Sequence, residues 1–423
     1  MKAVILAAGQ SSRFKPLSDN RHKGLTEVLG KPIIEHTIEE LERIGIEDVV
    51  VVQGPDRKFE ESLDVEAEFV VQENPEGMGH ALRQAEHLLD EHFLVLNPYH
   101  ATSSHIIEDL VEKAEEEGTE LAFVSRETDQ PEDYGILHIE NGKAVGVTEK
   151  PERGEAPSNK RIVGMYLLNS DIFDYMDDVE TWEYQFEDAL DQQASENPGS
   201  IPEIEEETTS IKYPWNLFEF IEELMESRGR NISENASVAD SAEIKGDVIV
   251  EDGAEIYEYA VIKGPAYIGE DVTVGNSTLV RDHTALERGV TIGANTEVKN
   301  SVFQPESSLH SEYFGDSIVG RNTHIGAGTI TANRKFREND DRPSIEADLI
   351  GKGYEKDTGR SFMGTVIGDD VDIGINVSLM PGVQIGSDAK IGPGTVVHEN
   401  VEHGETVYVN QEQIRKDRGD GEK

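Results

Sequence analysis

Near the start of the chain, a turn of small residues is followed by two cations, and these are the residue types of a phosphate-binding site. The turn, residues 7–12, follows the apolar run Ala3–Leu6, which is long enough for one buried strand. Small side chains let backbone N–H groups approach a ligand closely, and turn amides of this kind bind anions. Arg13 and Lys23 would add positive charge where a triphosphate needs it. Such a turn is also common without a ligand, so the turn alone leaves both interpretations open.

A second glycine-rich turn, within residues 72–82, ends another apolar run and opens a helical pattern. Gly77 and Gly79 would let the backbone pass close to a nucleobase, and Gln72 could form a hydrogen bond with the edge of the base. The same glycines could instead serve only to shape the turn between strand and helix. The residues by themselves do not decide between a base site and a plain turn.

The order of residues in the first part of the chain resembles the signature of sugar-1-phosphate nucleotidyltransferases. The resemblance is carried by 6–9, Arg13, 16–18, Lys23 and 30–34. It implies a nucleoside triphosphate and a sugar 1-phosphate as substrates, with Arg13 and Lys23 as catalytic cations that stabilise phosphate charge. It also implies nucleotide contacts from Leu6, Ala8, Gly9, Gln72 and Gly77, and sugar contacts from Tyr134, Gly135, Glu149, Lys150 and Gly164.

Two of the sugar positions have an ordinary alternative. Glu149 could accept a hydrogen bond from a sugar hydroxyl, and Lys150 could bind the sugar phosphate. Without the resemblance, the pair would be interpreted as a surface ion pair in a turn.

The metal site of the same family is where this sequence departs most. Residues 93–100 resemble a strand that ends in Asn-Gly-Asp, in which the aspartate holds Mg²⁺, but here Tyr99 stands at the aspartate position. A neutral phenol is a poor ligand for a hard cation. Asn216, in a segment resembling the second metal position, is the one metal ligand that we predict. A rival hypothesis is therefore a regulatory or scaffold protein that binds nucleotide sugars, with or without acetyltransferase activity.

The charge balance excludes several classes of partner. The chain has 423 residues, with 86 acidic against 38 basic residues and a formal net charge of -48. Nucleic acid binding needs a basic surface, so no nucleic acid partner is expected. Acidic residues spread along the whole chain suit a halophilic protein, because high salt screens their repulsion. No apolar run approaches the ~18 residues of a membrane span, so we expect a cytoplasmic protein without a membrane partner.

Apolar runs alternate with helical patterns through the first half. Strands are expected at 48–52, 67–72, 93–96, 121–125 and 162–168, and helices at 34–44, 79–89 and 106–116. This alternation predicts an α/β, Rossmann-like nucleotidyltransferase domain with a mainly parallel sheet, whose ligands bind at the carboxyl ends of the strands.

A period of six residues governs the second half. Apolar residues recur at every sixth position: Val238, Ile244, Val250, Ile256, Ile262, Ile268, Val274, Val280, Leu286, Ile292 and Val298, and again from Ile367 to Val397. This period predicts an all-β domain, a left-handed parallel β-helix of hexapeptide repeats. Two segments, 300–317 and 333–365, are expected to interrupt the ladder as loops. Such a β-helix could serve only as a structural trimerisation rod.

Residues 308–333 resemble the acetyltransferase segment of bifunctional N-acetylglucosamine-1-phosphate uridyltransferases and their archaeal two-domain relatives. The resemblance implies acetyl-CoA as co-substrate, a homotrimer through the β-helix, and His310 as the catalytic base. Histidine suits that role because its ordinary pKa lies near neutrality. The implied substrate contacts are Arg281, Lys299, Tyr313 and Asn333. A histidine with only a structural role in a loop is the alternative for His310.

The predicted organisation is a nucleotidyltransferase-like domain at 1–228, a linker at 229–235, the β-helix at 236–402 and a polar tail at 403–423. The predicted function is nucleotide-sugar biosynthesis. The first domain would transfer a nucleotidyl group to a sugar 1-phosphate, and the second would acetylate an amino-sugar phosphate. The nucleotide, the sugar and the acyl group stay open at this stage.

Overall fold

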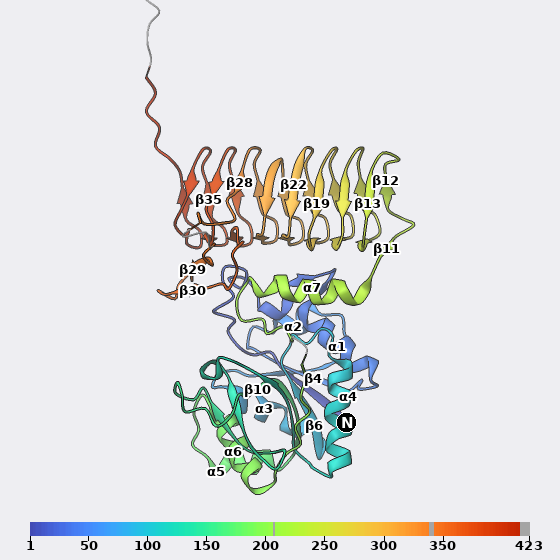
Figure 1. Cartoon of the computed structure of the whole chain (residues 1–423), viewed down its shortest axis with the longest axis vertical. Helices are drawn as coiled ribbons and strands as arrows, with labels where there is room; N and C mark the ends of the chain where they lie inside the picture. The colour runs from blue at the N-terminus through green and yellow to red at the C-terminus, as the bar shows by residue number, and fades with distance from the viewer. Residues whose placement is uncertain (206–207, 338–341, 415–423) are drawn as a thin grey trace, which may run out of the picture. The chain divides into compact units, whose positions relative to one another are not determined.

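The computed structural model describes residues 1–205, 208–337 and 342–414 (Figure 1). Contacts within the chain divide it into two compact units. The first unit consists of Met1–Phe14 and Asn20–Gly229, and the second of Lys15–Asp19 and Arg230–Lys423. No helix among the described residues is long and apolar enough to cross a membrane.

The first unit is built on a mixed sheet. Its parallel part has the order β5-β4-β1-β6 and consists of β1 (Lys2–Leu6), β4 (Val49–Gln53), β5 (Glu68–Val71) and β6 (His92–Leu96). Antiparallel strands continue the sheet beyond β6: β7 (Ala122–Glu127), β8 (Gly135–Glu140), β9 (Lys143–Glu149) and β10 (Lys160–Asn169). A small separate pair is formed by β2 (Glu27–Val28) and β3 (Lys31–Pro32).

Successive residues of the central strands enter two different hydrophobic cores. Val4 and Leu6 belong to one core, whereas Ala3 and Ile5 belong to the other. A strand that is buried on both faces needs a continuous apolar run, and this explains why β1 has one. The helices are α1 (Ile33–Arg43), α2 (Lys58–Ser62), α3 (Met78–Ala85), α4 (Ser104–Glu117), α5 (Ile172–Asp178), α6 (Gln185–Glu196) and α7 (Asn216–Arg228), with 3-10 turns η1 (Lys23–Leu25), η2 (Glu86–Leu88) and η3 (Pro131–Asp133).

The expected α/β architecture is confirmed, with one addition. The parallel strands and the helices between them lie close to the predicted positions. The β8–β9 hairpin was not predicted, because its short strands show no regular alternation of apolar and polar residues, and β10 runs antiparallel to β6. Neighbouring strands of the sheet are therefore parallel only in the part made of β5, β4, β1 and β6.

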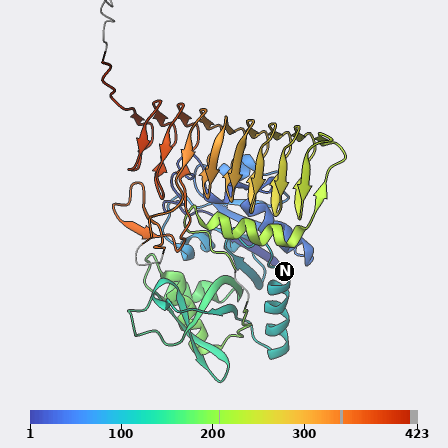
Figure 2. The ribbon, with the colours of Figure 1, turned by 45° about the horizontal axis from the view of Figure 1, so that its top comes forward.

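The second unit is a β-helix whose stacked coils are visible in Figures 1 and 2. Equivalent strands of neighbouring coils pair in parallel, so that Glu255 is opposite Thr273, three hexapeptides further on. One sheet consists of β11 (Asn231–Ile232), β14 (Val248–Val250), β17 (Ala266–Ile268), β20 (Thr284–Leu286), β23 (Val302–Phe303), β26 (Ile318–Val319), β31 (Val366–Ile367) and β34 (Gln384–Ile385).

The other faces of the coils form further parallel sheets. One consists of β12 (Ser237–Val238), β15 (Glu255–Ile256), β18 (Thr273–Val274), β21 (Thr291–Ile292), β24 (Ser308–Leu309), β27 (His324–Ile325), β32 (Asp372–Ile373), β35 (Lys390–Ile391) and β37 (Thr406–Val407). The third face carries β13 (Glu243–Lys245), β16 (Val261–Lys263), β19 (Leu279–Arg281), β22 (Thr296–Lys299) and β25 (Glu312–Gly315), followed by β28 (Ile330–Thr331), β33 (Ser378–Leu379) and β36 (Val396–Val397). A hairpin, β29 (Glu346–Asp348) and β30 (Glu355–Asp357), projects from the coils.

The expected loop at 300–317 is wrong, because the coil continues through it. Phe303, Leu309 and Phe314 point into the core and are fully buried, at spacings of five and six residues that break the strict period. The predicted edges of the β-helix also differ from the strands observed. β11 lies in the predicted linker and pairs with β14, and β37 lies in the predicted tail and pairs with β35. Residues 415–423 of that tail lie outside the described residues.

Candidate active sites

A cavity of about 860 Å³ lies at the carboxyl ends of β1, β5 and β6 in the first unit. Backbone and side chains of the turn after β1 line it, together with the segments that follow β5 and β6. The cavity brings together the predicted residues Leu6, Ala8, Gly9, Arg13, Lys23, Gln72 and Gly77. This is the edge of a parallel sheet at which ligands are expected to bind.

The turn predicted to contact a base is held by its own hydrogen bonds. Gln72 is buried, and its Nε2 donates to the carbonyl oxygen of Gly77 at 3.1 Å. Gly77 has a φ of 103°, and a Cβ there would lie 2.5 Å from the carbonyl oxygen of Glu183. Only glycine fits this position, so both residues shape the cavity wall that a base would contact.

Three cations, Arg13, Lys23 and Lys212, line the same cavity. The Lys23 ammonium donates to the carbonyl oxygen of Ile211 at 2.6 Å. Burial, reinforced by Arg13 and Lys212, lowers the pKa of Lys23 to about 7. Burial and the Arg13 charge likewise lower the pKa of Lys212 to about 8. Within the described ranges, none of the three cations forms an ion pair with a carboxylate.

Lys212 was not among the predicted site residues. Its ammonium lies 4.1 Å from the centroid of the Tyr134 ring, which also receives the Arg161 guanidinium at 4.6 Å. Lys212 directly precedes the segment 213–217 that carries the metal resemblance, and that proximity was the available signal. Arg161, at the start of β10, had no comparable signal.

Tyr99 stands at the position that the sequence resemblance assigns to a metal-binding aspartate. The Lys23 ammonium lies 4.7 Å from the centroid of its ring. Burial raises the pKa of the Tyr99 phenol, whereas a hydrogen bond with Ser210 and the Arg13 charge lower it. The phenol is therefore neutral at ordinary pH and offers no anionic oxygen to a metal.

Asn216 lies in the turn that opens α7. Its Oδ1 accepts hydrogen bonds from the backbone N–H groups of Lys212 at 3.1 Å and Tyr213 at 2.8 Å. These bonds use both lone pairs of the amide oxygen, so the geometry disagrees with the predicted role of metal ligand. No group of three or more His, Asp or Glu residues in the described part of the chain could hold a metal ion. The described residues therefore provide no cluster of carboxylates that would hold Mg²⁺ with protein ligands alone.

Four of the five predicted sugar residues, Tyr134, Gly135, Glu149 and Lys150, lie in or beside the β8–β9 hairpin. Gly135 pairs with Glu149, and a Cβ on Gly135 would lie 2.9 Å from Glu149 Oε2. Lys150 Nζ is 3.1 Å from Glu149 Oε1 and donates to the Tyr184 hydroxyl at 3.2 Å. Gly164 lies apart, against the Asn97 side chain: a Cβ on Gly164 would lie 2.2 Å from Asn97 Nδ2. Asn97 lines the cavity, so Gly164 adjoins its wall.

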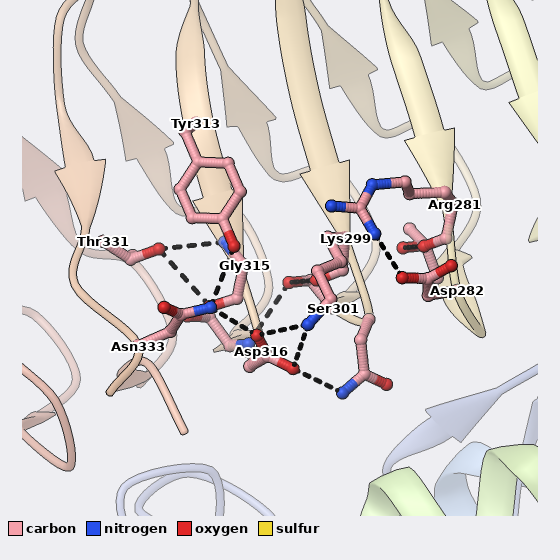
Figure 3. A network of polar contacts seen from close by, with 12 residues as sticks. Arg281, Asp282, Lys299, Ser301, Tyr313, Gly315, Asp316, Thr331 and Asn333 are labelled. Carbon is pink, nitrogen blue, oxygen red and sulfur yellow. Dashed lines mark hydrogen bonds and ion pairs between the residues drawn. The ribbon is translucent and has the colours of Figure 1, made fainter. Parts of the chain in front are cut away.

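In the second unit, three of the predicted acetyltransferase residues, Lys299, Tyr313 and Asn333, gather around Asp316, a carboxylate that was not predicted as a site residue (Figure 3). Asp316 is 1% exposed and accepts hydrogen bonds from Lys299 Nζ at 3.1 Å and from Asn300 at 2.8 Å. Asn333 Nδ2 donates to Asp316 at 2.6 Å and to the Tyr313 hydroxyl at 2.8 Å. Asp316 thus fixes the positions of the polar groups around it.

Arg281 lies one coil before Lys299, with which it is paired in the sheet. Its guanidinium donates to Glu297 Oε1 from Nε at 2.9 Å and from Nη2 at 2.7 Å, and it also contacts Asp282. Burial raises the pKa of the nearby Tyr313 hydroxyl, and the Asp316 and Glu297 charges raise it further. The two cations therefore lie side by side with their geometry set by carboxylates.

His310 lies on a different face of the coil, in a groove of about 800 Å³. It is exposed, and a Cβ on the neighbouring Gly293 would lie 1.9 Å from its carbonyl oxygen, so the preceding coil needs glycine there. The groove also carries Ser308, His324 and Lys390. Within the residues that the structure describes, no hydrogen bond joins the His310 imidazole to the Asp316 network.

Family models match both halves of the chain. A model described as nucleotidyl transferase matches residues 2–199, and one described as bacterial transferase hexapeptide (six repeats) matches residues 364–399. Together with the stacked coils, the hexapeptide match confirms the predicted left-handed β-helix.

Similar proteins cover nearly the whole chain. "Bifunctional sugar-1-phosphate nucleotidylyltransferase/acetyltransferase" of Sulfurisphaera tokodaii is 35% identical over 96% of this chain and 99% of its own length. "Bifunctional protein GlmU" of Methanococcus maripaludis is 37% identical over 98% of both chains. "UTP--glucose-1-phosphate uridylyltransferase AglF" of Haloferax volcanii is 33% identical over 45% of this chain and 82% of its own length.

Proposed function

Because the chain belongs to the family of archaeal bifunctional sugar-1-phosphate nucleotidylyltransferases/acetyltransferases, we propose that it catalyses both reactions of that family name. The first unit would convert a nucleoside triphosphate and a sugar 1-phosphate into a nucleotide sugar and pyrophosphate. The second unit would transfer an acetyl group from acetyl-CoA to an amino-sugar phosphate. The observation that carries the proposal is the similarity over nearly the full length of the chain, which includes both candidate sites.

In the first reaction, a phosphate oxygen of the sugar 1-phosphate attacks the α-phosphorus of the nucleotide. A new P–O bond forms while the bond from the α-phosphorus to the bridging oxygen breaks, and pyrophosphate leaves. Arg13 and Lys23 face the cavity and would stabilise the negative charge on the phosphoryl oxygens. Glu149 would accept a hydrogen bond from a sugar hydroxyl, and Lys150 beside it would bind the sugar phosphate.

In the second reaction, the amine of the sugar attacks the thioester carbonyl of acetyl-CoA. The C–N bond forms, the C–S bond breaks, and the thiol of coenzyme A leaves. His310 would take the proton from the amine, because its exposed imidazole has no hydrogen-bond partner among the described residues. Arg281 and Lys299 would bind the phosphate of the acceptor, with Tyr313 and Asn333 beside them.

The first activity is tested by pyrophosphate release from the purified chain in high salt. A panel of nucleoside triphosphates is combined with glucose 1-phosphate or N-acetylglucosamine 1-phosphate, with Mg²⁺ present. We expect turnover with at least one pair, and the active pair names the substrates. No turnover with any pair, together with retained binding of nucleotide sugars, would support the rival role as a binding or regulatory protein.

The second activity is tested by release of the coenzyme A thiol from acetyl-CoA, with glucosamine 1-phosphate as acceptor. We expect His310→Ala to lower the rate by roughly 10²–10⁴-fold, the usual contribution of a general base. His398→Ala is the matched control, because the His398 side chain is 72% exposed and lies outside the groove. Equal rates for the two variants would remove His310 from the mechanism.

We further propose a cytoplasmic homotrimer, assembled through the β-helix and adapted to high salt. The repeat architecture supports the trimer, and the net charge of -48 supports the adaptation. Light scattering of the full chain across a range of KCl concentrations tests both. We expect a trimer mass in high salt and loss of folded protein in low salt; a monomer at every salt concentration would contradict the assembly.

A further inference from the structure

We propose that the first unit binds the polyphosphate chain of its nucleotide through Arg13, Lys23 and Lys212, without a divalent cation held by the protein. The inference rests on the proposed function for the class of ligand, a nucleoside triphosphate. It adds which residues neutralise the charge of that ligand. In this chain Tyr99 stands where the sequence resemblance expects a metal-binding carboxylate.

The first argument is charge balance. The chain carries 86 acidic and 38 basic residues, so a lysine or arginine meets a carboxylate easily. Arg281, Arg288 and Lys299 in the second unit all do so. Arg13, Lys23 and Lys212 line one cavity, and none forms an ion pair with a described carboxylate; the Asp133 charge acts on Lys212 without forming such a pair. Unpaired cations that converge on a cavity create a site for a polyanion, because charge-assisted hydrogen bonds to phosphate then meet no competing carboxylate.

The second argument is the position of Lys23. Its ammonium lies above the Tyr99 ring, at 4.7 Å from the centroid, and is fixed by the Ile211 carbonyl oxygen at 2.6 Å. Tyr99 follows β6 at the place where a carboxylate would hold the metal. The favourable partner of an aromatic face is a cation, so the aromatic ring helps to fix the ammonium in place. The positive charge that a metal would bring to this strand end is supplied by the chain.

The third argument concerns the carboxylates that do line the cavity. Glu76 and Glu183 belong to the segments that meet at Gly77, where the Glu183 carbonyl is in contact with the backbone. The three cations come from other segments, after β1 and before α7. Mg²⁺ is usually held by one or two carboxylates together with substrate phosphates and water, and the two carboxylates that line the cavity lie beside Gly77 rather than at the end of β6, where Tyr99 stands.

Binding of a base-free probe separates the phosphate contacts from the rest of the site. Inorganic tripolyphosphate, and in parallel UTP, are titrated into the full chain by calorimetry, either with excess EDTA or with Mg²⁺. We expect binding in EDTA that Mg²⁺ does not tighten: Mg²⁺ complexes the polyphosphate in solution and neutralises part of its charge, so the dissociation constant should stay equal or rise. Binding that requires Mg²⁺, or that tightens with it by about tenfold or more, would overturn the inference.

Lys212→Met tests whether the cations are responsible. We expect it to weaken tripolyphosphate binding in EDTA by about tenfold or more, because one charge-assisted contact is lost. Lys113→Met is the control: its side chain is 42% exposed on α4, where it pairs with Glu117, and its binding should equal that of the unchanged chain. Equal binding by both variants would contradict the role of Lys212.

Substitution of Tyr99 supplies the reverse test. Tyr99→Asp places a carboxylate beside Lys23, so we expect weaker binding in EDTA and partial rescue by Mg²⁺. Tyr99→Phe keeps the ring and should bind tripolyphosphate in EDTA within about threefold of the unchanged chain. If Tyr99→Asp is unfolded by circular dichroism, the Tyr99→Phe and Lys212→Met results decide.

The inference and the proposed function fail in different ways. Turnover of a nucleotide with Mg²⁺-dependent binding would overturn the inference and leave the nucleotidyltransferase. Metal-independent binding without turnover of any substrate pair would support the inference and contradict the activity.

Discussion

The two candidate sites of this chain both contain cations that are proposed to bind phosphate, but they hold those cations differently. In the first unit, Lys23 is held by a carbonyl oxygen and an aromatic ring. In the second unit, Arg281 is held by Glu297 and Lys299 by the buried Asp316. The cations of the first site form no ion pair with a described carboxylate, although the Asp133 charge acts on Lys212, whereas Arg281 and Lys299 of the second site are each paired with a carboxylate before any ligand arrives.

The difference matches the ligands proposed for the two sites. A triphosphate carries several negative charges, and an uncompensated cation cluster binds such a polyanion most strongly. An amino-sugar phosphate carries a single phosphate group and an amine, so its recognition depends more on the positions of the donors than on their number. A carboxylate that pairs with a cation fixes the position of that cation but weakens its attraction for a phosphate.

The largest effect is expected from removing an unpaired cation. Lys23→Met removes the ammonium that lies against Tyr99, and we expect nucleotidyl transfer to fall by roughly 10²–10³-fold, the usual loss for one charge-stabilising donor. The measurement is pyrophosphate release at saturating substrate. Acetyl transfer by the same protein is the internal control and should stay unchanged. A loss of less than about threefold would show that Lys23 is not needed for charge stabilisation.

The next effect concerns the buried carboxylate of the second site. Asp316→Asn removes the charge that pairs with Lys299, and Asp316 is 1% exposed. We expect the free energy of unfolding to fall by about 3–5 kcal/mol, because the lysine is left without its buried partner. Urea denaturation followed by circular dichroism gives this value. An unchanged midpoint would mean that Asp316 is not a structural centre of the network.

A pH dependence distinguishes the first site from a site made of paired cations. Burial lowers the pKa of Lys23 to about 7, so in the free protein the side chain is mostly protonated below that pH and mostly neutral above it. Binding of tripolyphosphate favours the ammonium form, and affinity should therefore fall as pH rises above about 7, by up to tenfold per unit.

The control for this pH dependence is Lys23→Arg. A guanidinium stays charged throughout the range, so the variant should lose the slope between about pH 7 and 8 and keep only the fall above about pH 8 that comes from Lys212. An equal slope in the two proteins would assign the titration to another group.

The smallest effect is expected at the partly exposed pair of the second site. Glu297→Gln removes one partner of Arg281, in a pair whose side chains are 38% and 28% exposed. We expect a change of about 0–1 kcal/mol in the free energy of unfolding, by the same denaturation measurement. A loss as large as that of Asp316→Asn would contradict the distinction between the buried and the exposed carboxylate.

Much of the fold could be predicted because its signals are periodic. Each hexapeptide places one apolar residue inside the coil, so the ladder from Val250 to Val298 was visible without a structure. The coil through Phe303 and Phe314 was missed, because spacings of five residues keep the stacking but break the period. The β8–β9 hairpin was missed because its strands have no such regular pattern.

The sites were predictable where a residue belongs to a linear motif. Arg13, Lys23 and His310 were predicted in this way; Arg13 and Lys23 line one cavity, and His310 lines the groove of the second unit. Lys212 and Asp316 gain their importance from residues distant in the chain: Lys212 from Arg13 and Tyr134, and Asp316 from Lys299 and Asn333. Such convergence depends on tertiary packing, which residue spacing does not reveal.

Separation of the two activities in one chain tests the proposed function most directly. Pyrophosphate release and coenzyme A release are measured on the unchanged chain, on Lys23→Met and on His310→Ala. We expect both activities in the unchanged chain, loss of only the first in Lys23→Met, and loss of only the second in His310→Ala. Absence of either activity from the unchanged chain under all substrate pairs, or loss of both from one substitution in a folded protein, would contradict two independent transferase sites.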